Sequence, residues 1–119
     1  MNILHLQPKE LGKREKVETR VSEIAKGVTY QLSDTQYLFQ TRPEDLSLIN
    51  GRASKLNALV SLGMASLDDT TIVGTDGATS PLTWRSEDNM DIAFTVREFL
   101  EFAIYVDEFV ESKYKESWI

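Results

Sequence analysis

The sequence predicts an α+β domain in which two β-hairpins form a small antiparallel sheet packed against two longer helices, plus an N-terminal helical arm. Three observations predict it: paired β-rich runs around polar turns, two long segments with helical apolar spacing, and a charge-rich segment before them. A chain of 119 residues can bury one hydrophobic core without a disulfide or metal. We therefore divide it into an arm, residues 1–26, and a single domain, residues 27–119.

The charge-rich segment from Lys9 to Lys26 is predicted to be a helix that ends at Gly27. Its apolar face is narrow, because only Val17, Val21 and Ile24 recur at helical spacing. Such a thin stripe places the helix either at the edge of the domain or on another subunit. The residues before it contain an apolar group suited to a sticky extended arm, formed by Ile3, Leu4 and Leu6.

Two pairs of β-rich runs predict hairpins. The first pair is VTYQL and QYLFQT, around the polar turn at residues 33–35, and the second is Leu82–Arg85 and Met90–Phe94, around the sequence SEDN. Between the hairpins, residues 67–81 are rich in Asp, Thr and Gly and predict a loop, in which Thr71–Val73 is a candidate edge strand.

Both long helices carry start signals. Pro43 suits a first helical turn, and the acids Glu44 and Asp45 oppose the helix dipole there. The apolar stripe of this helix is Ile49, Ala53, Leu56, Val60 and Met64. The last helix is predicted to begin after Thr95, because Thr95 and Glu98 have the capping-box spacing. Its core stripe is Phe99, Ala103, Val106, Val110 and Tyr114.

The composition removes most catalytic chemistry. The chain has no cysteine and one histidine, His5, which excludes disulfides, thiolate zinc sites and histidine-based triads within one copy. The carboxylates at residues 68–76 and 87–91 lack the order of an EF-hand loop and lie in polar segments, so we interpret them as turn-forming acids. The GTDG sequence lacks the lysine of a phosphate-binding loop. We expect no enzyme, no metal and no cofactor.

The charge distribution indicates which partners to expect. The net charge of −6 argues against nucleic-acid binding, and no apolar run is long enough to span a membrane. Residues 1–30, 31–60 and 61–119 carry net charges of +2, 0 and −8. This asymmetry favours either solubility or head-to-tail packing of copies. The start of the chain lacks the pattern of a signal peptide, so we expect synthesis in the cytoplasm.

Two further features concern partners and ion pairs. Trp118 and Ile119 either form an exposed partner surface or pack back on the first hairpin. Arg42 and Arg85 are candidates for buried structural ion pairs with Asp45 or Asp88. The candidate partner-binding residues are therefore Ile3, Leu4, Leu6, Val17, Val21, Ile24, Trp118 and Ile119.

Four motifs occur in order between Tyr37 and Trp118. They are Q-T-R-x-x-D-x-x-x-I-x-G within FQTRPEDLSLING, W-R-x-x-D-N within LTWRSEDN, T-x-x-E-F, and Y-x-x-S-W. In this order and spacing the chain resembles a small domain of unknown function that recurs in bacteriophage tail-fibre proteins and tail-fibre assembly proteins. The segment from Lys9 to Lys26 lies outside the resemblance.

The resemblance implies a role in a phage tail, and it supplies no catalytic residues. The first hypothesis is a virion component of the baseplate or tail-fibre attachment region that is present in several copies and binds neighbouring tail proteins. The second is an assembly chaperone that leaves before the particle matures. Related proteins often continue past the Ser-Trp pair as a charged helix, so functions that need such an extension are not carried over.

Overall fold

The computed structural model describes residues 20–117, which begin with a helical segment at 20–25. A turn at Gly27 leads from it into the first hairpin, where β1 (Val28–Leu32) pairs antiparallel with β2 (Thr35–Phe39). Gly27 has a φ of 93°, and a Cβ atom there would lie 2.5 Å from the carbonyl oxygen of Phe39. Only glycine therefore joins the helical segment to the hairpin without strain.

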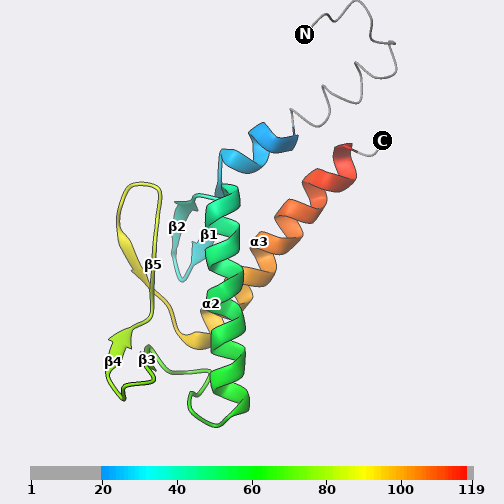
Figure 1. Cartoon of the computed structure of the whole chain (residues 1–119). Coiled ribbons are helices and arrows are strands. Elements are labelled where there is room, and N and C mark those ends of the chain that lie inside the picture. Colours follow the sequence, from blue (N-terminus) through cyan, green and yellow to red (C-terminus); the bar gives the residue numbers. More distant parts are fainter. Residues whose placement is uncertain (1–19, 118–119) are drawn as a thin grey trace, which may run out of the picture.

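Two longer helices, α2 (Pro43–Ser61) and α3 (Val96–Ser117), pack together. In Figure 1 the hairpins lie beside α2, and α3 runs diagonally past it. The predicted helix starts are confirmed. The amide of Thr95 donates to Glu98 Oε1 at 2.8 Å, and the amide of Glu98 donates to Thr95 Oγ1 at 3.1 Å, which completes a capping box.

The hairpins differ from the prediction in number and arrangement. In residues 20–117 there are three separate two-stranded antiparallel sheets, so the prediction of two hairpins forming one small sheet is wrong. The additional hairpin pairs β3 (Thr71–Val73) with β4 (Thr79–Pro81), and the last pairs β5 (Thr83–Arg85) with β6 (Asp91–Ala93). The loop at 67–81 therefore contains a hairpin of its own, with the candidate strand Thr71–Val73 as one half.

A backbone hydrogen bond links the last hairpin to the first. The amide of Glu87, in the turn between β5 and β6, donates to the carbonyl of Leu38 in β2. The bonds from Leu82 to Thr70 and from Phe94 to Leu82 instead extend the β3–β4 and β5–β6 pairings by one residue pair each. Because one bond is not a ladder, the first and last hairpins remain separate sheets.

The core is an aromatic cluster between the hairpins and α3. Phe39, Phe94, Phe99 and Phe102 are all fully buried, and the ring centroids of Phe39 and Phe102 lie 4.8 Å apart. From α2, Ile49 and Leu56 of the predicted stripe are buried, whereas Met64 lies past the end of the helix and is exposed. Within residues 20–117, neither helix has an apolar stretch sufficient to cross a membrane.

Candidate interaction surfaces

The structure places only two of the predicted partner-binding residues. Ile24 is buried, and Val21 is 57% exposed in the same helical segment. Six others lie outside the described residues, namely Ile3, Leu4, Leu6, Val17, Trp118 and Ile119. For these six residues partner binding stays a prediction. For Trp118 and Ile119, both alternatives stay open: an exposed partner surface, or packing on the first hairpin.

The helical segment at 20–25 is held against the outer half of α3, residues 107–116. Glu23 forms an ion pair with Lys113 at 3.3 Å, and the Arg20 guanidinium lies 4.2 Å from the centre of the Tyr114 ring. The hydrogen bond from Lys113 to Glu23 is the main cause that raises the pKa of Lys113. These contacts are exposed or half-buried, so each contributes little free energy individually.

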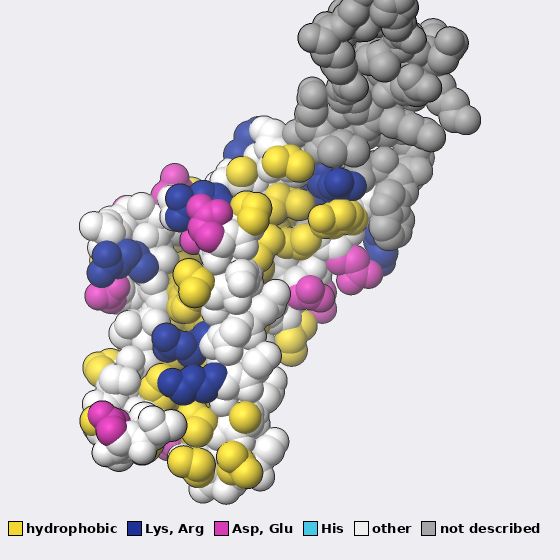
Figure 2. Space-filling view, viewed as in Figure 1, with side chains coloured by type: hydrophobic (Ala, Val, Ile, Leu, Met, Phe, Trp, Pro, Cys, Tyr) yellow, Lys and Arg dark blue, Asp and Glu magenta, His cyan; other side chains and the backbone are white. Residues whose placement is uncertain are grey.

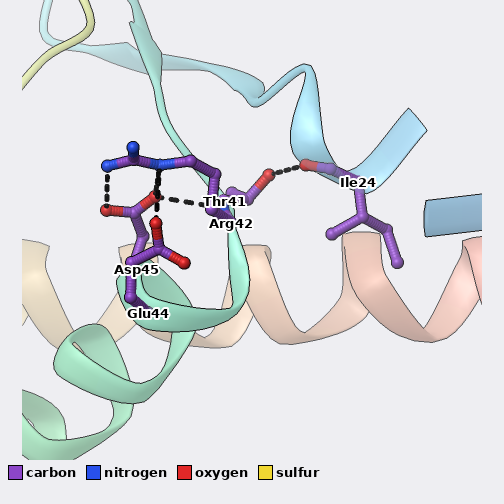
Figure 3. A network of polar contacts seen from close by, with 5 residues as sticks. All are labelled: Ile24, Thr41, Arg42, Glu44 and Asp45. Carbon is purple, nitrogen blue, oxygen red and sulfur yellow. Dashed lines mark hydrogen bonds and ion pairs between the residues drawn. The ribbon is translucent and has the colours of Figure 1, made fainter. Parts of the chain in front are cut away.

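A stronger anchor lies at the start of α2, drawn in Figure 3. The hydroxyl of Thr41, which is fully buried, donates to the carbonyl oxygen of Ile24. This bond gives the helix-end carbonyl of Ile24, which also accepts from the amide of Gly27, a second donor, and it joins residues 17 positions apart in the chain. Thr41 therefore fixes where the helical segment meets the domain.

Next to this anchor, Arg42 and Asp45 form a two-pronged contact (Figure 3). Arg42 Nε lies 2.8 Å from Asp45 Oδ2, Arg42 Nη2 lies 3.2 Å from Oδ1, and the Arg42 amide also donates to Oδ2 at 3.0 Å. The hydrogen bond to Asp45 is the main cause that raises the pKa of Arg42. The predicted pair with Asp45 is confirmed, but its burial is wrong, since the Arg42 side chain is 46% exposed.

The prediction for Arg85 is corrected in both partner and burial. Arg85 Nε donates to Asp91 Oδ1 at 3.1 Å, and Arg85 Nη1 donates to Asn89 Oδ1 at 3.2 Å. Arg85 stands directly opposite Asp91 in the β5–β6 register, whereas Asp88 accepts a hydrogen bond from the Ser86 hydroxyl inside the turn. The Arg85–Asp91 pair is exposed to solvent.

Two shallow hollows lie along α2, on the flank that faces the hairpins. One has a volume of about 520 Å³ and is lined by Leu48 and Arg52 of α2 and by Trp84 of β5. The other, about 490 Å³, lies towards the β3–β4 hairpin and is lined by Lys55 and Leu59. Figure 2 shows Lys and Arg side chains on the same face as α2, with hydrophobic side chains above and below them.

The polar side chains of the described residues were compared with two kinds of built site, a metal-ligand cluster and an unpartnered buried group. No group of three or more His, Cys, Asp or Glu side chains between residues 20 and 117 is arranged to hold a metal ion. In the same part of the chain, each buried side-chain nitrogen or oxygen has a hydrogen-bond partner. What this geometry provides is a set of charged and apolar side chains on helix faces.

Comparison of the chain with protein-family models, with curated proteins and with solved structures finds no match.

The prediction from sequence missed two features of these surfaces. Arg52 and Lys55 were not predicted as part of a surface, because charged residues on a helix are typical of any solvated face. With Leu48 and Leu59 they recur at i, i+4, i+7 and i+11, which is a single helix face. The role of Thr41 was also missed, because a threonine before a helix is expected to cap that helix rather than bind a distant carbonyl.

Proposed function

We propose that this chain is a non-enzymatic structural component of a bacteriophage tail, located in the baseplate or tail-fibre attachment region. The support is the resemblance of its four ordered motifs to the small tail-fibre domain. One structural observation supports the proposal: motif residues form the contacts that begin the two long helices. Asp45 pairs with Arg42 at the start of α2, and Thr95 with Glu98 caps α3.

Motif residues in such positions support a shared scaffold rather than a shared reaction. A domain that recurs in many tail proteins needs a conserved frame on which each protein carries its own contacts. In this proposal the partners are neighbouring tail proteins, such as fibre and baseplate subunits, and the chain is present in several copies. It is made in the cytoplasm of the bacterial host and ends in the virion.

The contact surfaces in this proposal are the N-terminal segment and the acidic outer face of α3. The exposed acids of that face are Glu101, Asp107, Glu108 and Glu111. Acidic residues on an exposed helix set the choice of partner and the rate of association more than the final affinity. The expected neighbours therefore present basic surfaces.

Mass spectrometry of purified particles tests the proposal. Particles from a phage that encodes this chain are compared with particles from the same phage in which the gene is deleted. We expect peptides of the chain in the first sample at an abundance similar to that of other minor tail subunits. If mature particles lack the chain, the structural proposal is wrong.

A second candidate function is that of a tail-fibre assembly chaperone. The observation that favours it is that the resembled domain also recurs in tail-fibre assembly proteins. In this case the gene deletion yields particles with missing or misfolded fibres, while the wild-type particle contains no copy of the chain. The same mass spectrometry, combined with electron microscopy of the fibres, separates the two candidates.

A further inference from the structure

One flank of α2 carries two cationic side chains without an acidic partner. Arg52 and Lys55 form no ion pair or hydrogen bond within the part of the chain that the structure describes. Most other basic side chains there do form ion pairs, namely Arg42, Arg85, Arg97, Lys113 and Lys115. Because the chain carries a net charge of −6, unpaired cations on one helix face are a local exception.

These cations belong to a stripe that also has apolar ends. Leu48, Arg52, Lys55 and Leu59 follow one another at intervals of four, three and four residues along α2. Leu48 is 62% exposed, and Leu59 is half-buried. The stripe lines both hollows, one with Leu48 and Arg52 and the other with Lys55 and Leu59, so these side chains are open to contact by another helix.

A stripe of opposite charge lies on the outer face of α3. Ile104, Glu108 and Glu111 follow one another at intervals of four and three residues, which matches Leu48, Arg52 and Lys55. Ile104 is 59% exposed, and Glu108 has no ion pair with any described residue. Glu111 has only the exposed pair with Lys115, at 2.9 Å. In Figure 2 acidic side chains lie along the edge of the molecule that α3 forms.

We propose that the α2 stripe of one copy binds the α3 stripe of a second copy. In this contact Leu48 packs against Ile104, while Arg52 and Lys55 pair with Glu108 and Glu111. The two stripes are different surfaces of the same chain, so the contact is head to tail and extends into a ring or an open series of copies.

We expect this contact to be weak, because the area that it buries is small. A single helix pair buries less area than the roughly 1,600 Å² of a standard interface, so association requires a high concentration of the protein. If a particle holds several copies of the chain, as in the proposed function, they are locally concentrated enough to associate. The inference rests on the proposed function in this respect alone. The contact itself is a property of the purified chain and is tested there.

Two charge-reversal variants test the inference. Arg52→Glu with Lys55→Glu makes the α2 stripe acidic, and Glu108→Lys with Glu111→Lys makes the α3 stripe basic. The four positions are exposed or half-buried, and circular dichroism of each variant verifies that it folds. Sedimentation equilibrium from micromolar to millimolar protein at low salt measures the average mass of each variant alone and of the two mixed.

We expect the wild-type mass to rise with concentration at low salt and to return to the monomer value at high salt. Each variant alone associates ~tenfold more weakly or not at all, and an equal mixture regains association because each reversed stripe then meets an opposite charge. A wild-type protein that stays monomeric throughout, or a mixture that associates no better than its components, overturns the inference.

A matched control separates the contact from general repulsion. Lys26→Glu with Arg97→Glu changes the net charge as much as the α2 variant does, at exposed positions outside both stripes. We expect this control to associate as the wild type does, and equal loss in the control and the α2 variant contradicts a specific contact. Because these experiments use the purified chain, their outcome is independent of whether particles contain it.

Discussion

The two halves of α3 differ in what covers them. In the inner half, residues 96–106, Val96, Phe99, Phe102 and Val106 are buried against the hairpins and α2. In the outer half, residues 107–116, no side chain is buried, and Lys113 and Tyr114 contact the helical segment at 20–25. Figure 1 shows this outer half extending past the hairpins, next to that segment.

Within one helix, the inner half therefore stabilises the fold, while the outer half offers side chains for contact with a partner. The inner half supplies aromatic rings that pack with centroids 4.8 to 5.7 Å apart, which is the basis of the folded state. The outer half has ion pairs and a cation–π contact that contribute little free energy individually, and the half-buried Phe109 packs against the core. The outer half can therefore exchange its contacts for those of a partner without unfolding the core.

The largest expected effect is in the inner half. Phe102→Ala removes a fully buried ring that contacts Tyr30, Phe39, Phe94 and Phe99, and we expect a loss of about 3–5 kcal/mol in the free energy of unfolding. Urea denaturation followed by circular dichroism measures it. The matched control is Phe109→Ala in the outer half, for which we expect a clearly smaller loss in the free energy of unfolding. Equal losses would remove the distinction between the two halves.

The next effect is at the joint between the helical segment and the first hairpin. Gly27→Ala places a Cβ atom against the Phe39 carbonyl at a φ of 93°, and we expect a loss of about 2 kcal/mol in the free energy of unfolding. The same denaturation measures it. Gly63→Ala is a matched control, since Gly63 also has a positive φ, of 73°, but has open space around it. A Gly27 variant no less stable than the Gly63 variant contradicts the close approach.

A smaller effect of opposite sign is expected in α2. Gly51 lies inside the helix, and a Cβ atom there would meet no other atom within 4 Å. The glycine therefore has no packing role in the described structure, and Gly51→Ala is expected to raise the free energy of unfolding by up to about 1 kcal/mol. Thermal denaturation measures the change. A destabilised variant would show that Gly51 has a role the fold does not explain.

The smallest effect concerns alkaline pH. Burial, followed by the charges of Glu101 and Glu98, raises the pKa of Tyr30 in the folded state. The folded chain then holds this proton more tightly than the unfolded chain, so the stability it contributes is present below pH of about 10 and is lost as the pH rises further. Urea midpoints measured across that range should fall less steeply for Tyr30→Phe. The same slope in both proteins contradicts the assignment.

Local signals predicted much of this fold. Pro43 and the Thr95–Glu98 spacing determined both helix starts, since capping depends on residues that are adjacent in sequence. Strand β4 was missed because Thr79, Ser80 and Pro81 are exposed and carry no β-forming pattern. The division of the strands into three sheets depends on how the hairpins are placed against one another, which leaves no periodic trace in the sequence.

The interaction surfaces were less predictable for a related reason. Helix at residues 20–25 was predicted, but the anchor between Thr41 and Ile24 depends on a contact between distant positions. The partner of Arg85 follows from the β5–β6 register, which places Asp91 opposite it. The stripe that contains Arg52 and Lys55 differs from other basic positions in lacking ion pairs with described residues, and ion pairs depend on the folded structure.

Hydrogen exchange measured on the free chain and on purified tail particles distinguishes the outer end of the molecule from its core. In the proposed function, the chain is held in a particle through its outer end while the core stays unchanged. We expect amides at residues 20–26 and 107–117 to exchange faster than those at 96–106 in the free chain and to gain protection in the particle. If protection in the particle is unchanged at these outer residues, or is gained only at 96–106, the account is wrong.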